Sequence, residues 1–104
     1  MNEAAKGRAR VDANLPVELP SAGGTSLATT SDISTGGCYI ESEQPARVGS
    51  RILFRLQLPS GRWLMLAGEV THAREGSGFG VRFVGTAEAS RQALTNLIEY
   101  LRGR

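Results

Sequence analysis

The chain has 104 residues, of which 40% are hydrophobic and 21% are charged, and its formal net charge is +2. This length fits one domain, and the composition is typical of a soluble globular protein rather than of a disordered chain. No apolar run approaches the roughly 18 residues of a membrane span, so we expect no transmembrane segment.

The residue types also limit the chemistry. One cysteine, Cys38, cannot form an intrachain disulfide, and with one histidine, His72, it does not supply a structural metal cluster. The amino terminus lacks the apolar core of a secretory signal, so we expect a cytoplasmic protein. Among the basic residues only Lys6 is a lysine, and the other 11 are arginines, whose planar fork binds phosphate bidentately.

Residues 1–10 are predicted to form a flexible basic arm, because they are polar and have no apolar periodicity. The alternating apolar residues at 15–19 predict a short strand. Pro16 and Pro20 interrupt this pattern, which favours an edge strand. A turn is expected at 21–24.

The central part of the chain alternates between strand patterns and turns. Residues 26–33 predict a half-exposed strand that ends at a Gly36-Gly37 corner, and the chain then resumes an extended course at 38–40. Residues 51–58 alternate apolar and polar side chains over a full strand.

Two more strands are expected further along. Residues 62–74 predict a long strand in which Gly68 marks a bulge or bend, and the period-2 pattern of 78–83 predicts its neighbour. We expect Trp63 and Phe79 to lie in the core or at a barrel rim, and Cys38 to be a small buried residue.

The carboxyl-terminal segment predicts a helix from about 86 to 102. Thr86 is the expected N-cap, and Leu94, Leu97, Ile98 and Leu101 follow helical spacing along one face. That face covers the core, although a second apolar face could mediate dimerisation. The predicted fold class is mainly β: a small six-stranded antiparallel barrel with a C-terminal helix, forming one domain over 11–104.

Enzymatic patterns are absent from the sequence. His72 is the only histidine, no G-x-S-x-G turn occurs, and the carboxylates form no obvious close pair. The glycine-rich segment 76–80 lacks the Lys-Ser/Thr of a phosphate loop and is better interpreted as a hairpin turn. We therefore expect a protein without enzymatic activity. The modest net charge also argues against DNA binding.

Two segments have complementary binding chemistry. Lys6, Arg8 and Arg10 place three cations within five residues, and Asp32 and Ser34 lie at the strand-end corner with the glycine pair. A carboxylate accepts hydrogen bonds from the N1–H and N2–H edge of guanine, whereas Arg binds the O6/N7 edge. A glycine at position 37 lets backbone approach a ligand closely.

These residues resemble the motifs of the PilZ domain, a bacterial receptor module for cyclic dimeric GMP (c-di-GMP). The family motif [D/N]-x-S-x-x-G is matched by Asp32, Ser34 and Gly37. The motif R-x-x-x-R is matched in part, because Lys6 stands at its first position and Arg10 at its second. The segment Gly80-Val81-Arg82-Phe83 resembles the family's G-V-x-F strand. The resemblance extends over residues 6–101.

The resemblance implies a c-di-GMP site in which the arm closes over phosphates and guanine faces while the corner holds a guanine edge. It assigns ligand contacts to Lys6, Arg10, Asp32, Ser34 and Gly37, with Arg8, Gly36, His72 and Arg74 as further candidates. Lysine lacks the bidentate fork, so Lys6 predicts weaker binding or none. No cofactor other than this ligand is expected.

The implied function is a non-enzymatic c-di-GMP receptor whose binding orders the arm and alters a protein-interaction surface. Its expected partner is an effector of motility, pilus or surface-attachment systems. The alternative is a PilZ-like adaptor that has lost nucleotide binding and acts by protein contacts in motility or pilus control. Lys6 motivates this alternative.

Each candidate also has a purely structural interpretation. Asp32 and Ser34 are typical of an ordinary turn in which they cap backbone N–H groups. The basic cluster resembles a solvated tail. His72, on a strand among apolar neighbours, fits a structural histidine with satisfied hydrogen bonds. Arg74 likewise fits a surface residue without a ligand contact.

Overall fold

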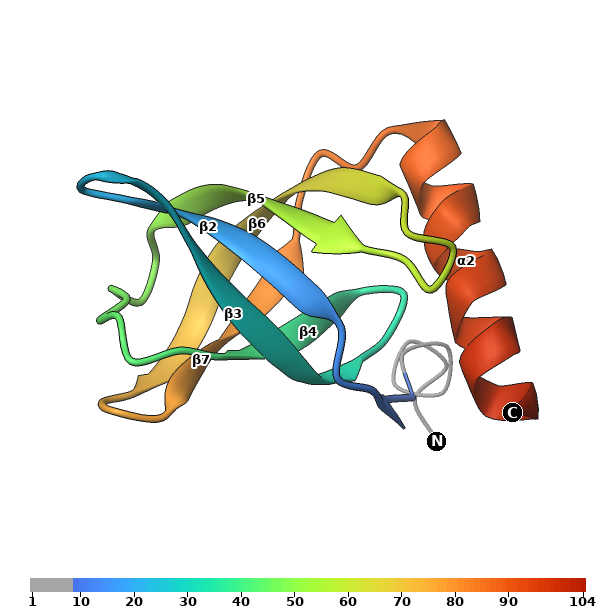
Figure 1. Cartoon of the computed structure of the whole chain (residues 1–104), viewed down its shortest axis with the longest axis horizontal. Helices are drawn as coiled ribbons and strands as arrows, with labels where there is room; N and C mark the ends of the chain where they lie inside the picture. The colour runs from blue at the N-terminus through green and yellow to red at the C-terminus, as the bar shows by residue number, and fades with distance from the viewer. Residues whose placement is uncertain (1–8) are drawn as a thin grey trace.

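The strands form a closed antiparallel barrel with one extra strand, in a computed structural model that describes residues 9–104 (Figure 1). The sheet order is β1-β3-β2-β5-β6-β7-β4, and pairing of β3 with β4 closes the ring. The elements are β1 (Val11–Asp12), β2 (Pro16–Ser21), β3 (Gly24–Ile33), β4 (Gly37–Glu41), β5 (Arg51–Gln57), β6 (Trp63–Arg74), β7 (Gly78–Phe83) and α2 (Glu88–Gly103). The predicted fold class is confirmed, with β1 as the added strand.

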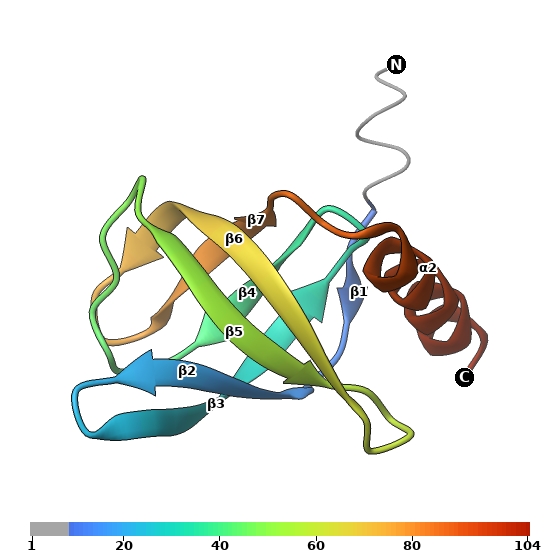
Figure 2. The same cartoon turned by 90° about the horizontal axis from the view of Figure 1, so that it is seen from above.

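Alternation along the strands fills the barrel with apolar side chains. On β5, Phe54 and Leu56 are buried while Leu53, just before Phe54, is exposed, as a period-2 strand requires. The predicted stripe of α2, from Leu94 to Leu101, is buried. The helix lies across one end of the barrel, as Figure 2 shows. Within residues 9–104, α2 is the only helix, and it is too short and polar to cross a membrane.

Cys38 lies in this core, as predicted. Its side chain is completely buried on β4, and burial raises the pKa of its thiol to about 12. The thiol therefore stays protonated at neutral pH and behaves as a small apolar residue.

The prediction of an edge strand at the first prolines is wrong, because β2 lies between β3 and β5. The carbonyl of Leu15 accepts a hydrogen bond from β3, so alternation turns the nitrogens of Pro16 and Pro20 toward the β5 side. There β2 pairs at only two residues, Val17 and Glu18. The prolines lie outside this short ladder, so their missing N–H groups cost no sheet hydrogen bond.

The predicted bulge at Gly68 is also misplaced. Gly68 pairs regularly with both neighbouring strands, and the register of β6 against β7 shifts between Val70 and His72 instead. A Cβ at position 68 would lie 2.0 Å from Cγ1 of the buried Val81. Close packing inside the barrel, rather than a bend, therefore explains this glycine.

The helix begins later than its sequence pattern predicts. The N-cap is Ala87, which makes no side-chain capping hydrogen bond, so the prediction of Thr86 as N-cap is wrong. The carbonyl of Thr86 accepts a hydrogen bond from Nη2 of Arg91 at 3.2 Å. Glu88 in the first turn complements the positive end of the helix dipole.

A buried hydroxyl attaches the amino-terminal segment to the barrel. Thr30 on β3 is completely buried, and its Oγ1 donates to the carbonyl of Ala13 at 2.6 Å while accepting from the N–H of Leu15 at 3.0 Å. These bonds fix the chain between β1 and β2. They thereby hold β1, and the residues that enter it, against β3.

We predict that Thr30→Val lowers the free energy of unfolding by about 2 kcal/mol, because it leaves two buried backbone groups unpaired at about 1–3 kcal/mol each, partly relieved by relaxation. Urea denaturation measures the change. Thr29→Val, at a half-buried neighbour on the same strand, is the matched control and is expected to change stability little. Equal losses in the two variants would contradict a specific role for the Thr30 hydroxyl.

Candidate functional site

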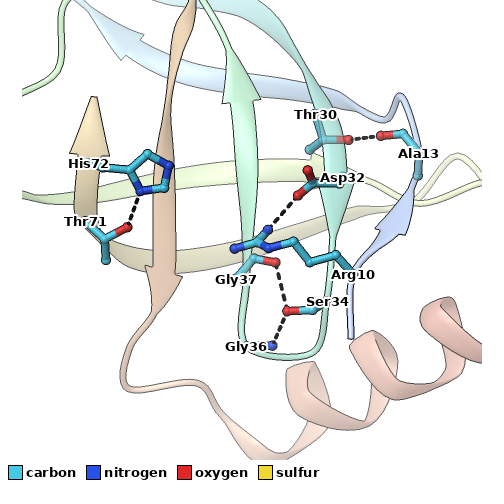
Figure 3. Close-up of polar contacts among 9 residues, drawn as sticks. All are labelled: Arg10, Ala13, Thr30, Asp32, Ser34, Gly36, Gly37, Thr71 and His72. Carbon is cyan, nitrogen blue, oxygen red and sulfur yellow. Dashed lines mark hydrogen bonds and ion pairs between the residues drawn. The ribbon is translucent and has the colours of Figure 1, made fainter. Parts of the chain in front are cut away.

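The corner between β3 and β4 is built around Ser34. Its backbone N–H donates to the carbonyl of Gly37 at 2.8 Å. Its Oγ accepts from the N–H of Gly36 at 3.1 Å, as Figure 3 shows. A longer contact of 3.4 Å joins Oγ to the Gly37 carbonyl. Ser34 is only 2% exposed. The side chain therefore holds the turn, as the structural interpretation of this motif predicts.

Arg10 reaches this corner from its position just before β1, the strand that pairs with the end of β3. The register of β1 on β3 sets Asp12 opposite Asp32, and Arg10 just before β1 forms an ion pair with Asp32, with Nη1 2.6 Å from Oδ1. Figure 3 shows its side chain extending past the corner toward the carboxylate. The side chains are 46% and 29% exposed. Exposed pairs of this kind contribute about 0–1 kcal/mol, so the pair can open for a ligand.

A hollow of about 210 Å³ lies between this corner and the strands β6 and β7. It is smaller than the roughly 300–1,000 Å³ of typical ligand pockets. Four predicted residues line it beside three that the sequence patterns did not single out as site residues: Arg10, Ser34, Gly36, Gly37, Thr71, Val81 and Arg82. A ligand larger than the hollow must therefore extend over the outer surface of the barrel.

Gly37 has a structural requirement of its own. A Cβ built at this position would lie 2.2 Å from the carbonyl oxygen of Val81 on β7. The absence of a side chain lets β4 approach β7, which differs from the expected reason, an approach to ligand. Gly37 still lines the hollow.

His72 belongs to a row of cross-strand partners beside the hollow. Asp32 pairs with Tyr39, Tyr39 with Gly80, and Gly80 with His72, across β3, β4, β7 and β6. The His72 ring lies over Gly80, where a Cβ would come within 2.1 Å of it, and its centroid is 5.8 Å from that of Tyr39.

His72 is exposed, and its Nδ1 lies 3.1 Å from Oγ1 of Thr71. It is therefore a surface residue rather than a histidine enclosed by apolar neighbours. Figure 3 places Thr71 and His72 on β6, and Thr71 lines the hollow together with the Ser34 corner.

Among the described candidates, Asp32, His72 and Arg74 do not line the hollow. Arg74 lies at the end of β6, paired with Gly78, and does not line the hollow. Lys6 and Arg8 lie outside the described residues, as does most of the predicted arm.

Arg82 is the charged residue that the sequence interpretation missed. It pairs with Gly37 across β4 and β7, and its Nη2 lies 2.7 Å from Oε1 of Glu69 on β6. One signal was present: Arg82 is the only charged residue in β7 and alternates with buried neighbours, so it must face outward. Its proximity to the corner follows only from the pairing of β7 with β4.

Comparison with known proteins gives one family and several similar structures. The family model described as PilZ domain matches residues 7–100, and no curated protein sequence matches. The Bacillus subtilis inhibitor of motility MotI/DgrA has a TM-score of 0.79 at 18% identity, over 93% of this chain and 51% of that protein. This chain therefore spans about half the length of MotI.

Two isolated PilZ domains are also similar. The PilZ domain of CeSA from a cellulose-synthesizing bacterium has a TM-score of 0.67 at 26% identity, over 90% of this chain and 98% of that one. The PilZ domain of Escherichia coli YcgR, solved with c-di-GMP, has a TM-score of 0.76 at 16% identity, over 92% and 90%. These likenesses support the barrel fold. Among residues 9–104 no group of three His, Cys, Asp or Glu side chains is arranged to hold a metal.

We predict that Gly37→Ala lowers the free energy of unfolding by about 1–3 kcal/mol, because the new methyl group forces β4 away from β7. Thermal or urea unfolding measures the loss. Gly23→Ala is the matched control, since a Cβ there meets nothing within 4 Å. A Gly37→Ala variant as stable as Gly23→Ala would show that the strands accommodate the methyl group.

Proposed function

This chain belongs to the PilZ domain family, and from that premise we propose that it is a non-enzymatic receptor for c-di-GMP. The observation that carries the proposal is that Arg10, which is paired with Asp32, lines one surface hollow together with the corner of Ser34 and Gly37. The match of the family motif to the same positions supports it. So does the c-di-GMP in the structure of the E. coli YcgR domain.

The chemistry assigns different tasks to the two charged residues. Asp32 accepts from the N1–H and N2–H groups of a guanine, and Arg10 binds a phosphate or the O6/N7 edge. Both tasks require the Arg10–Asp32 ion pair to rearrange. Charge-assisted bonds to the ligand replace it, and these are shorter and stronger than neutral hydrogen bonds.

The small size of the hollow supports a proposed role for the amino-terminal arm. Because the hollow is smaller than a typical ligand pocket, residues about 4 to 10 are proposed to close over the part of the dinucleotide that extends beyond it. Lys6 and Arg8 supply further cations in this closed form. Ordering these residues costs roughly 1–2 kcal/mol each, which the new contacts must exceed.

The closed form presents a changed surface to a partner protein. We place this receptor in the bacterial cytoplasm, acting on an effector of motility, pilus or surface-attachment systems. The similarity to an inhibitor of motility supports this class of partner. A domain that binds no c-di-GMP and acts by protein contacts alone is the competing function, and Lys6 in place of an arginine is the residue that favours it.

Titration calorimetry with c-di-GMP tests the receptor function. The wild-type chain is expected to bind with micromolar or tighter affinity. Arg10→Ala and Asp32→Ala are expected to abolish measurable binding, because each removes one of the two charged groups that contact the ligand.

The control is Glu18→Ala, which removes the carboxylate of the Arg55 ion pair on β2 and β5, away from the hollow. It is expected to bind c-di-GMP as the wild type does. No heat from the wild type at high ligand concentration would reject the receptor function in favour of the adaptor.

Lys6→Arg is predicted to tighten c-di-GMP binding several-fold, because it restores the bidentate fork at the first position of the basic motif. The same titration measures the change, with Lys6→Ala as the second variant. If the arginine variant binds no tighter than wild type, residue 6 does not contact the ligand.

A further inference from the structure

The hollow at the corner contains two guanidinium groups, and each is already paired with a carboxylate. Arg10 pairs with Asp32, with Nη1 2.6 Å from Oδ1, and Arg82 pairs with Glu69, with Nη2 2.7 Å from Oε1. The arginines come from opposite ends of the chain, one before β1 and one from β7. Each of the two cations is therefore neutralised by a carboxylate of the protein itself.

Arg82 is placed to serve the same ligand as the corner. It lies opposite Gly37 across β4 and β7, and it lines the hollow together with Ser34 and Gly36. Its side chain is 50% exposed, so the guanidinium is open to solvent on the side that Glu69 does not occupy. A guanidinium has five N–H donors, which leaves donors for an anion.

Glu69 keeps a cationic neighbour after it releases Arg82. Glu69 pairs with Arg51 across β5 and β6, and among residues 9–104 no ion pair involves Arg51. A half-exposed ion pair is weak, whereas a phosphodiester binds the arginine fork in two parallel hydrogen bonds. The geometry therefore favours a phosphate over Glu69 as the partner of the Arg82 guanidinium.

We propose that Arg82 is a phosphate-binding residue of this site and that Glu69 competes with the ligand for it. This inference rests on the proposed function, because the phosphodiester is that of the bound cyclic dinucleotide. Binding transfers Arg82 from Glu69 to a phosphate, and the freed carboxylate lies beside Arg51. Glu69 thereby sets the affinity of the site without contacting the ligand.

Calorimetry with c-di-GMP on the full chain tests this competition. Arg82→Ala is expected to weaken binding at least tenfold, and Arg82→Lys to restore only part of the loss, because lysine has no fork. Glu69→Gln is expected to tighten binding several-fold. Glu18→Gln, which opens the Arg55 ion pair on another part of the barrel, is the matched control and is expected to leave the affinity unchanged.

The double variant Glu69→Gln/Arg82→Ala distinguishes competition from a general charge effect. If Glu69 acts through Arg82, the double variant binds as weakly as Arg82→Ala alone. If Glu69→Gln tightens binding equally with and without Arg82, the carboxylate acts only by long-range repulsion and the inference is overturned. Unfolding curves of every variant establish that the compared chains are folded.

A second measurement separates this inference from the receptor function. Inorganic pyrophosphate is titrated while the arginine side-chain Nε–H signals are followed by NMR. The Arg82 signal is expected to move, and to move at lower pyrophosphate concentration in Glu69→Gln, while that of Arg55 stays in place. A wild type that binds no c-di-GMP rejects the receptor function, and an Arg82 signal that does not move overturns the role of Arg82.

Discussion

The close approach of β4 to β7 is the constraint on which the site depends. β4 closes the barrel by pairing with β3 on one side and β7 on the other. This approach requires Gly37, where a Cβ would lie 2.2 Å from the Val81 carbonyl, and Gly78, where it would lie 2.2 Å from that of Ile40. Separating these strands would take Arg82 away from the corner of Ser34, so closure of the barrel and assembly of the site have one cause.

In the proposed receptor, recognition is an exchange of ion pairs rather than the filling of an empty cavity. Both arginines of the hollow have carboxylate partners in this structure, and both pairs are partly exposed. Water and salt weaken exposed pairs, so little free energy is lost when an anion replaces the carboxylate. Under this proposal, the same carboxylates disfavour anions that cannot supply better-aligned hydrogen bonds, and the site selects bidentate groups such as phosphate.

Much of the fold followed from local patterns, and the errors have a common physical origin. The period-2 runs predicted the strands at 51–58 and 78–83, because each strand has one face in the core. The errors at Pro16 and Gly68 arose because a proline or a glycine reports only local backbone freedom. Whether that freedom serves an edge, a bulge or close packing depends on the neighbouring strand. Thr86 was mistaken for the N-cap for a similar reason, since a hydroxyl indicates a capping ability that the chain does not use.

The sequence by itself determined the mainly β class, the terminal amphipathic helix and the Asp32–Ser34–Gly37 corner, because periodicity and turn chemistry are properties of consecutive residues. Only the tertiary structure decided that Arg10 pairs with Asp32, that the His72 ring lies over Gly80, and that Arg82 lines the same hollow. These contacts join residues far apart in the chain. Strand register sets them, and register is fixed by how the whole barrel closes rather than by any one segment.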